Sequence, residues 1–438
     1  MKKLNIGLIG WGTVGTGMIQ IMQKNSQLLE KRLGAHLVLK KVADLDLLRK
    51  RDISLLPEML TKKADEVIDD PDIDILVELI GGIEPAKQYI LKAIRKGKHV
   101  VTANKALLAM HGDEIFKEAE SYGVDLGFEA SVGGGIPVIR VIKEGLSSNS
   151  MISIYGILNG TTNYILTKML NENKDFNEVL AEAQKLGYAE ADPSLDIEGI
   201  DAAHKLAILV AISFGKKIDF SKIAIEGIKD ITLLDCMFAK EFGYCIKLLG
   251  IAKTDGRGVI EVRVHPTLIP LSHSLASVDN VFNAIYLTGD ATGPIMVYGK
   301  GAGMMPTGSA VVSDIIEIGR NIISGAKKRL LPLGIAKKWV EEAKLLPFDE
   351  IQTPYYIRFS AVDRPGVLSK ISGILGNEDI SIASVIQKGR AVEGMVPIVM
   401  LTHEAKEKNI KKAIEKINKL DITGGTKATI IRIENNLS

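Results

Sequence analysis

The sequence predicts an α/β protein with a doubly wound parallel sheet, a second α+β domain and a small C-terminal domain. Three observations support this prediction. Strand and helix patterns alternate over residues 1–130, the pattern changes near Gly133, and residues 354–438 carry their own order of elements. Repeated strand–helix–strand units pair their strands in parallel, so the first observation determines the fold class.

The first domain is expected over residues 1–130. Its strand candidates are short and apolar, and helical patterns separate them, for example at residues 83–96. The predicted strands cover residues 4–9, 37–43, 75–79, 99–102 and 124–128.

A glycine-rich turn follows the first strand and opens a helix. Its sequence, Gly10-Trp11-Gly12-Thr13-Val14-Gly15, has the spacing G-x-G-x-x-G. The glycines allow a tight turn and close approach of a pyrophosphate, and the helix N-terminus offers free N–H groups to phosphate. We therefore expect a Rossmann-type site for NAD or NADP, contacted by Gly10, Gly12, Thr13, Val14 and Gly15.

Asp44 ends the second strand and is the candidate ligand of the adenosine ribose. It lies 34 residues after Gly10, farther than the usual spacing of about 20. An aspartate at this place favours NAD because it repels a 2′-phosphate, whereas Arg49, Lys50 and Arg51 could neutralise one. The sequence leaves NAD and NADP as alternatives.

The second domain is expected over residues 131–340 and a linker over residues 341–353. Strands are predicted at residues 152–158 and 259–265. Helices are predicted near residues 161–171, 176–186 and 198–214, and residues 309–340 are also predicted to be helical.

Residues 354–438 are predicted to fold as β-α-β-β-α-β, the ferredoxin-like order. The strands are expected at residues 356–361, 380–388, 395–401 and 427–433, and the helices at residues 367–377 and 404–420. Pro365 and Gly366 suit a tight turn that leaves the N-terminus of the first helix open to a small anion.

The composition narrows the classes of function. A net charge of +2 gives no electrostatic case for nucleic acid or an acidic membrane. The sequence lacks an apolar run of about 18 residues, so we expect no membrane span. The first strand is expected to start at Lys3, so we expect no signal peptide. Cys236 and Cys245 do not form a metal-type cluster, and we expect both as small buried side chains in a reducing cytoplasm.

The most informative segment is residues 183–205, AQKLGYAEADPSLDIEGIDAAHK. It places Glu190, Asp192, Asp196, Asp201 and Lys205 around one helix start. Asp201 and Lys205 are four residues apart and therefore share a helical face. A lysine held by carboxylates can protonate or polarise a carbonyl oxygen that gains negative charge. An isolated D-x-x-x-K pattern is more often an exposed ion pair, but the agreement of five polar positions with a proline and a glycine favours a functional site.

Three further segments combine polar groups with turns. Residues 100–106, VVTANKA, place Lys105 at the carboxyl end of the fourth strand, where ligands bind in open α/β sheets. Residues 159–164, NGTTNY, offer Thr161 and Thr162 to a substrate or to the cap of a helix. In residues 127–137, GFEASVGGGIP, exposed carbonyls and Glu129 could hold a monovalent cation, or the glycines could form a hinge with no ion.

The segment at residues 183–205 resembles the signature of homoserine dehydrogenases, A-x-x-x-G-Y-A-E-x-D-P-x-x-D-I-x-G-x-D-x-x-x-K. The resemblance covers nearly the whole chain. It implies a reversible, NAD(P)-dependent reduction of L-aspartate 4-semialdehyde to L-homoserine. It also implies a glycine-rich loop around Gly303 that closes over the cofactor.

The resemblance implies a role for particular residues. The catalytic residues would be Lys205, Lys105 and Asp201, and Lys105 would also contact the cofactor. The substrate-binding residues would be Glu190, Asp196, Thr161, Gly160 and Tyr188. A sodium ion would be bound by Glu129 and by the backbone of Val132, Gly134 and Ile136.

The C-terminal domain resembles an ACT domain, a small amino-acid-sensing module. This resemblance implies feedback inhibition by L-threonine, bound near Asp363 and Gly366, and the wider family implies a homodimer or homotetramer. A plain ferredoxin-like appendage used for oligomerisation is the alternative for this domain.

Two other functions are alternatives for the whole chain. A non-catalytic NAD-binding amino-acid sensor would not need Lys105, Lys205 and Glu190 together. An aldehyde dehydrogenase for the same semialdehyde would need a cysteine nucleophile, and neither cysteine lies in a suitable loop.

Overall fold

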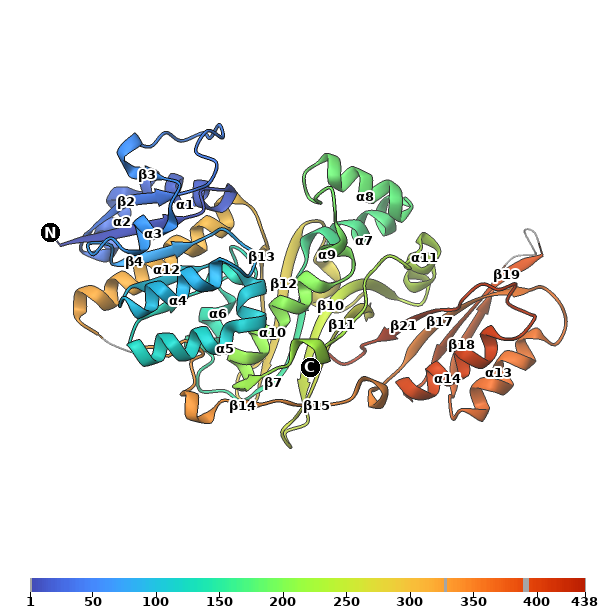
Figure 1. The fold of residues 1–438 in the computed structure, drawn as a ribbon. Helices are drawn as coiled ribbons and strands as arrows, with labels where there is room; N and C mark the ends of the chain where they lie inside the picture. Colours follow the sequence, from blue (N-terminus) through green and yellow to red (C-terminus); the bar gives the residue numbers. More distant parts are fainter. Residues whose placement is uncertain (1, 327–328, 389–393, 438) are drawn as a thin grey trace. The chain divides into compact units, whose positions relative to one another are not determined.

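The computed structural model of the chain describes residues 2–326, 329–388 and 394–437. The chain divides into two compact units. The first unit comprises residues 1–151, 203–222 and 282–343, and the second comprises residues 152–202, 223–281 and 344–438. Each unit is therefore assembled from separate stretches of the sequence, as the colours of Figure 1 show.

A six-stranded sheet forms the centre of the first unit, and all its strand pairs are parallel. The strand order is β3-β2-β1-β4-β5-β6. The strands are β1 (Lys3–Ile9), β2 (His36–Ala43), β3 (Leu60–Thr61), β4 (Ile75–Glu78), β5 (His99–Thr102) and β6 (Leu126–Gly127). This is the order of dinucleotide-binding folds, in which the ligand binds at the carboxyl ends of the strands, where the strand order reverses between β1 and β4. The predicted doubly wound parallel sheet is confirmed.

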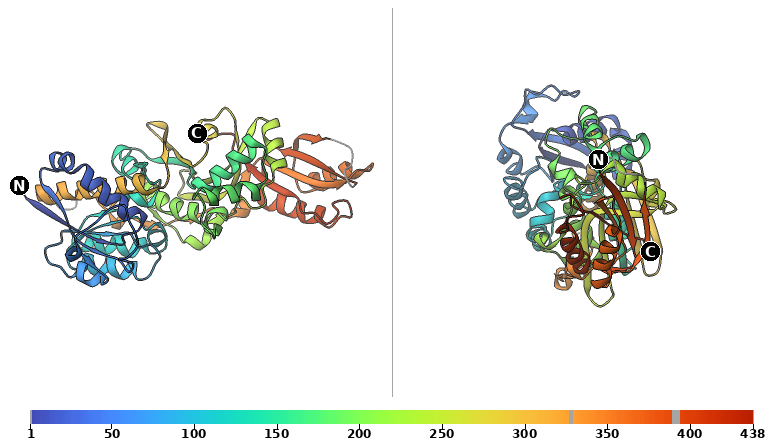
Figure 2. Two further views of the ribbon diagram at one scale, coloured as in Figure 1. Left: turned by 90° about the horizontal axis from the view of Figure 1, so that it is seen from above. Right: turned by 90° about the vertical axis from the view of Figure 1, so that its right-hand side faces the viewer.

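Helices cover both faces of this sheet. Figure 2 shows α1 and α12 on one face and α4 and α5 on the other. The helices are α1 (Thr13–Lys24), α2 (Ser26–Leu33), α3 (Ala64–Ile68), α4 (Ala86–Arg95), α5 (Lys105–Tyr122) and α12 (Met304–Ser324). Strand side chains such as Leu4, Ile6 and Leu8 are fully buried, as expected where helices cover a parallel sheet on both sides.

Two glycines allow α1 and α12 to touch at their backbones. A Cβ atom on Gly17 would overlap the carbonyl oxygen of Met304, and one on Gly308 would lie 2.7 Å from the backbone nitrogen of Met18. Any larger residue at either position would push the helices apart. The contact therefore holds the start of α12 against the helix that follows the glycine-rich turn.

The helix predicted over residues 309–340 is wrong beyond Ser324. Gly325 adopts φ 70° and donates its backbone N–H to the carbonyl of Asn321. This left-handed glycine ends α12 in the usual way, and Pro332 in the following stretch disfavours a new helix. The first unit also contains an antiparallel hairpin of β12 (Phe282–Gly289) and β13 (Gly293–Lys300) that was not predicted.

Several short elements complete the first unit. They are η1 (Pro57–Met59), η2 (Glu129–Ser131), α6 (Val138–Arg140), the π-helix η3 (Val141–Gly145), β8 (Lys216–Lys217), η4 (Phe220–Lys222), η6 (Lys337–Trp339) and β14 (Glu341–Glu342). Strand β14 pairs in parallel with β8.

The second unit contains a mixed sheet with strands in the order β7-β10-β11-β21-β17-β19-β18. The first three are β7 (Met151–Ile157), β10 (Tyr244–Thr254) and β11 (Val259–Pro270), so the strand predicted at residues 259–265 is longer than expected. The helices of this unit are α7 (Gly160–Glu172), α8 (Phe176–Lys185), α9 (Ser194–Ile197) and α11 (Leu233–Glu241). Helix α10 (Ile200–Phe214) begins in the second unit and belongs to the first unit from residue 203 onward. Shorter elements are β9 (Ala224–Ile225), η5 (Ser274–Ser277), β15 (Lys344–Leu345) and η7 (Phe348–Glu350).

The C-terminal part of this unit has the predicted ferredoxin-like topology. Its strands are β17 (Tyr355–Val362), β18 (Ile382–Gln387), β19 (Met395–Thr402) and β21 (Thr429–Ile433), which pair with one another in antiparallel fashion. Helices α13 (Val367–Asn377) and α14 (Glu407–Asn418) cover one face of them (Figures 1 and 2). The short strands β16 (Gln352–Thr353) and β20 (Ala405–Lys406) pair with each other.

The last strand, β21, belongs to two parts of the sheet at once. It pairs with β17 on one side and, in parallel, with β11 on the other, where Arg432 faces Thr267. The C-terminal domain is therefore hydrogen-bonded to the long strand β11. Within the described ranges, no helix has both the length and the apolar character needed to cross a membrane.

Candidate active site

The glycine-rich turn of the first unit has the geometry of a phosphate-binding loop. Gly10 adopts φ 101°, and a Cβ there would lie 2.6 Å from the carbonyl carbon of Leu79. A Cβ on Gly15 would overlap the carbonyl oxygen of Gly10. Gly12 differs, because no described atom lies within 4 Å of where its Cβ would be. Gly12 precedes α1, so the open space lies at the helix N-terminus, where a pyrophosphate fits.

Asp44 and Trp11 lie beside this turn and are hydrogen-bonded to each other. The Asp44 carboxylate accepts the backbone N–H of Trp11 at 2.6 Å and that of Asp46 at 2.8 Å. Arg51 donates its Nε to the Trp11 carbonyl at 2.8 Å, and its guanidinium lies 4.2 Å from the centre of the indole ring. The same guanidinium is 3.6 Å from Asp44, so Arg51 partly offsets the carboxylate charge.

A pocket of about 380 Å³ opens in front of Asp44. Its lining includes Gly10, Gly12, Asp44, Lys62 and Tyr89. The sequence predicted the two glycines and Asp44, but it did not predict Lys62 or Tyr89. No local motif marks these two residues, because they reach the pocket only through the arrangement of strands in the sheet.

Lys105 is the first residue of α5, directly after β5. The helix is capped by Asn104, whose side chain accepts the N–H of Leu107 and donates to the carbonyl of Gly82 at 2.6 Å. The buried Glu78 accepts the Thr102 hydroxyl at 2.6 Å. Burial raises the pKa of Glu78. These contacts hold the ends of β4 and β5 together and place Lys105 at the carboxyl edge of the sheet.

The two glycine-rich loops predicted near Gly134 and Gly303 touch each other. A Cβ on Gly134 would lie 2.6 Å from the carbonyl of Gly301, and the N–H of Gly135 donates to Lys300 at 3.1 Å. Gly303 adopts φ 121° and forms the N-cap of α12. The structure therefore brings these two predicted segments together in one place.

Glu129 binds the start of α6, the short helix that follows the glycines at residues 133–135. Its carboxylate accepts the N–H groups of Ile139 at 2.8 Å and Arg140 at 2.9 Å, and burial raises its pKa. The carbonyl of Ile136 accepts the N–H of Val138. Within the described parts of the chain, no group of three or more His, Cys, Asp or Glu side chains could hold a metal. One carboxylate with backbone carbonyls suits only a hard cation such as sodium.

In the second unit, Asn159 joins two of the predicted carboxylates. Its Nδ2 donates to Asp196 at 2.7 Å and to Asp201 at 2.9 Å. Its Oδ1 accepts the N–H of Thr162 and so caps α7. The sequence offered Thr161 and Thr162 to a substrate or to the cap of this helix, and the capping alternative is wrong because the side chain of Asn159 occupies the N-cap position. The signal for Asn159 was present, since asparagine is a preferred N-cap residue.

The other predicted substrate residues lie near Asn159 and Asp196 in the sequence. The Thr161 hydroxyl donates to the carbonyl of Tyr188 at 2.7 Å, and Gly160 is the first residue of α7. Glu190 lies between α8 and α9 with an exposed side chain, and its carbonyl accepts the side-chain amide of Gln184 at 3.1 Å.

Asp201 and Lys205 lie one turn apart on α10 and are both buried. Their exposed fractions are 9% and 8%. An isolated D-x-x-x-K pattern would usually be an exposed ion pair, and the structure excludes that arrangement here. A buried lysine one turn after a buried carboxylate is typical of a chemical site.

The chain combines a dinucleotide-binding loop at the switch point of a parallel sheet with a helix that carries a buried aspartate and a buried lysine. Together these features define a nicotinamide-dependent oxidoreductase. The profile of the homoserine dehydrogenase NAD-binding domain matches residues 10–129. The homoserine dehydrogenase profile matches residues 137–316, and the ACT domain profile matches residues 355–421. The chain belongs to the homoserine dehydrogenase family.

Relatives in other organisms resemble the chain over its full length. The homoserine dehydrogenase of Neisseria gonorrhoeae is 46% identical over 434 residues, which is 99% of each chain. That of Bacillus subtilis is 43% identical and covers 100% of this chain and 99% of its own. The crystal structure of a homoserine dehydrogenase from Thiobacillus denitrificans superposes with a TM-score of 0.93 at 45% identity, covering 99% of both chains.

A more distant structure contains a bound cofactor. A hyperthermophilic archaeal homoserine dehydrogenase in complex with NADPH matches 72% of this chain and 97% of its own, with a TM-score of 0.59 and 26% identity. The activity predicted from the sequence, homoserine dehydrogenase, is confirmed, as are the nucleotide-binding domain and the ACT domain.

Proposed function

We propose that Lys205 transfers the proton when this chain interconverts L-aspartate 4-semialdehyde and L-homoserine. The observation that carries this proposal is the hydrogen-bonded cluster of Asn159, Asp196 and Asp201 beside the start of the helix that bears Lys205. An amino-acid substrate brings an ammonium group, which binds well to carboxylates. We expect Lys205, one turn after Asp201 on α10, to act on the other end of a short substrate.

The chemistry divides between the cofactor and the chain. The nicotinamide of NAD(P)H, when bound, supplies a hydride to the aldehyde carbon. Lys205 donates a proton to the carbonyl oxygen as it becomes an alcohol, and removes that proton when the reaction runs in reverse. Lys105, at the carboxyl edge of the nucleotide-binding sheet, assists by stabilising negative charge on the same oxygen. Asp201 orients Lys205.

The remaining predicted residues bind the substrate and the cofactor. Glu190 and Asp196 bind the ammonium group, and Thr161, Gly160 and Tyr188 shape the site around it. For the cofactor, the open position at Gly12 supports a pyrophosphate on the turn formed by Gly10, Gly12, Thr13, Val14 and Gly15. The loop around Gly303 closes over the cofactor.

Both coenzymes are expected to bind. The carboxylate of Asp44 opposes the 2′-phosphate of NADP, while Arg51 at 3.6 Å and Lys62 in the same pocket weaken this repulsion. The balance of one carboxylate against two nearby cations supports a dehydrogenase that accepts NADH and NADPH.

The proposal also includes a bound sodium ion, feedback inhibition by L-threonine and self-association of the chain. A sodium ion is bound by Glu129 and the backbone of Val132, Gly134 and Ile136. L-Threonine acts as feedback inhibitor at Asp363 and Gly366, where Gly366 adopts φ 87° at the N-cap of α13 and leaves room for a carboxylate. The chain works in the cytoplasm as a homodimer or homotetramer.

The reaction is tested by following NADH and NADPH oxidation with L-aspartate 4-semialdehyde, with sodium present and with or without L-threonine. Turnover supports the proposal and ranks the coenzymes. A folded sample that binds a coenzyme but does not turn over with either would favour the non-catalytic sensor.

A further inference from the structure

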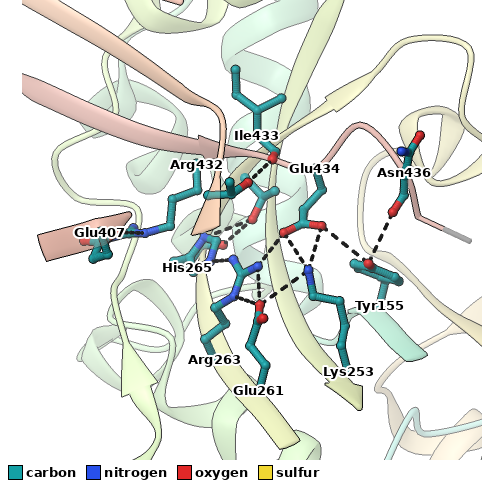
Figure 3. A network of polar contacts seen from close by, with 12 residues as sticks. Tyr155, Lys253, Glu261, Arg263, His265, Glu407, Arg432, Ile433, Glu434 and Asn436 are labelled. Atoms are coloured by element: carbon teal, nitrogen blue, oxygen red, sulfur yellow. Dashed lines mark hydrogen bonds and ion pairs between the residues drawn. The ribbon is translucent and has the colours of Figure 1, made fainter. Parts of the chain in front are cut away.

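Arg432 connects the ACT domain to a loop outside it. Its guanidinium lies on β21, is 4% exposed and is bound by two carboxylates. Nη1 and Nη2 donate to Glu226 at 2.6 and 2.9 Å, while Nε and Nη2 donate to Glu407 at 2.8 and 2.6 Å. Glu407 is the first residue of α14 of the ACT domain, and Figure 3 shows its carboxylate bound to Arg432. Glu226 follows the short strand β9 and lies far earlier in the sequence.

The two carboxylates differ in how firmly they are held. Glu407 is buried and also accepts the hydroxyl of Tyr355 at 2.8 Å. The side chain of Glu226 is 44% exposed. Arg432 therefore keeps a buried partner when the charge of Glu226 is removed, and we expect such a variant to fold. A bidentate pair also has a defined geometry, so Arg432 determines where the Glu226 carboxylate lies.

A second set of contacts fixes β21 itself. Glu434, two residues after Arg432, binds Arg263 of β11 and accepts Lys253 of β10 at 3.2 Å, as Figure 3 shows. Ile433 faces Leu268 in the register with β11. Arg432 therefore occupies a position that depends on the ACT sheet and on β11 together.

The loop that carries Glu226 lies against the segment that follows Asp196. The N–H of Ile228 donates to the carbonyl of Ile197 at 2.8 Å. A Cβ on Gly227 would overlap that carbonyl and lie 2.6 Å from the Cα of Glu198. On the other side, a Cβ on Gly199 would lie 3.2 Å from the carbonyl of Glu226. These are backbone contacts, which cannot be relieved by turning a side chain.

We infer that Glu226 is a positioning residue for the substrate site, through which Arg432 of the ACT domain sets the place of Asp196. Ile197 directly follows Asp196, and Asn159 ties Asp196 to Asp201. Arg432 is thus connected to Asp196 in three steps. They are the bidentate ion pair with Glu226, the backbone contact of the Glu226 loop with Ile197, and the peptide bond from Ile197 to Asp196. The inference rests on the proposed role of Asp196 in binding homoserine.

The test is the steady-state kinetics of the full chain with L-homoserine and the preferred coenzyme. Glu226→Ala loses both hydrogen bonds to Arg432, while Glu226→Gln keeps one acceptor. We expect Glu226→Ala to raise the KM for homoserine about tenfold and Glu226→Gln to raise it less, with the coenzyme KM unchanged. Glu241→Gln is the matched control, because Glu241 also pairs with a residue of the ACT domain, Lys388 at 2.6 Å, and its KM should equal that of the unmodified chain.

Asp196→Asn distinguishes a failure of the proposed substrate site from a failure of the role given to Glu226. If it leaves the homoserine KM unchanged, the proposed substrate site itself is wrong. If it raises that KM while both Glu226 variants match the unmodified chain, the site stands and the inference is wrong. If the Glu226 variants raised the KM for homoserine and the KM for the coenzyme by similar factors and also lowered the unfolding temperature, the inference would be overturned. Glu226 would then have a merely structural role.

Discussion

The side-chain amide of Asn159 donates to the Asp201 carboxylate at 2.9 Å, and this bond ties the end of β7 to the first turn of α10. The same nitrogen binds Asp196 at 2.7 Å. One uncharged donor thus holds two carboxylates that would otherwise repel each other. Their shared place beside the helix of Lys205 is the basis for the proposed substrate site.

Asn159→Asp tests this arrangement. The change removes the donor and adds a third carboxylate, so we expect the homoserine KM to rise about tenfold and the free energy of unfolding to fall by about 2 kcal/mol. Initial rates and urea unfolding measure the two effects. Asn173→Asp, at the exposed end of α7, is the control. Unchanged values for Asn159→Asp would show that the amide does not organise the cluster.

Asp44→Asn tests the choice of coenzyme. The amide keeps the acceptor for the N–H of Trp11 but removes the charge that opposes a 2′-phosphate. We expect the ratio of kcat/KM for NADPH over NADH to rise about tenfold. Asp46→Asn, which lies two residues further along, should leave the ratio near its original value. A ratio that stays constant in Asp44→Asn would place the 2′-position away from this carboxylate.

Asp314 predicts a dependence of stability on pH. Burial, with Glu129 nearby, raises its pKa to about 8 in the folded protein. The folded chain then holds a proton that the unfolded chain releases, so this residue makes stability fall as the pH rises from about 4 to about 8. Asp314→Asn removes that slope, and it should gain stability relative to the unmodified chain by up to about 1.4 kcal/mol per pH unit in this window.

Chemical denaturation at several pH values between 5 and 8 measures the effect. Asp113→Asn on α5, whose side chain is 55% exposed, should show a constant difference from the unmodified chain. The same constant difference in Asp314→Asn would mean that Asp314 is ionised in the folded protein throughout this range.

Asp363→Asn tests the effector site. If the carboxylate binds the ammonium of L-threonine, the change should raise the concentration for half-inhibition about tenfold and leave the uninhibited rate unchanged. Asp379→Asn, at the other end of α13, is the matched control. A point variant is preferable to removing the ACT domain, because β21 pairs with β11 and its removal would expose that strand. If L-threonine inhibited both variants with the same half-inhibition concentration, its binding site would have to lie away from Asp363.

The order of elements could be predicted from the sequence because it depends on local patterns. The apolar periods of strands and helices, the turn at Gly10–Gly15 and the order of the C-terminal domain are all properties of short windows. The ends of elements were less certain. The predicted helix at residues 309–340 ignored Gly325, whose left-handed conformation ends α12.

The parts that were not predicted depend on contacts between distant segments. Gly17 and Gly308 matter only because α1 and α12 cross at these positions. Asn159 carried a local signal as a helix cap, but its second role requires α9 and α10 to fold back onto it. Arg432 and Glu226 are 206 residues apart, and neither belongs to a motif that would connect them.

The kinetics of Lys205→Met test the central claim most directly. Methionine keeps a similar length and burial but cannot transfer a proton, so kcat should fall by roughly 10²–10⁴ while coenzyme binding and the unfolding temperature are retained. Lys216→Met, whose side chain pairs with Glu341 outside the proposed site, should keep its rate. Turnover close to normal in Lys205→Met would contradict the account, because another group would then have to move the proton.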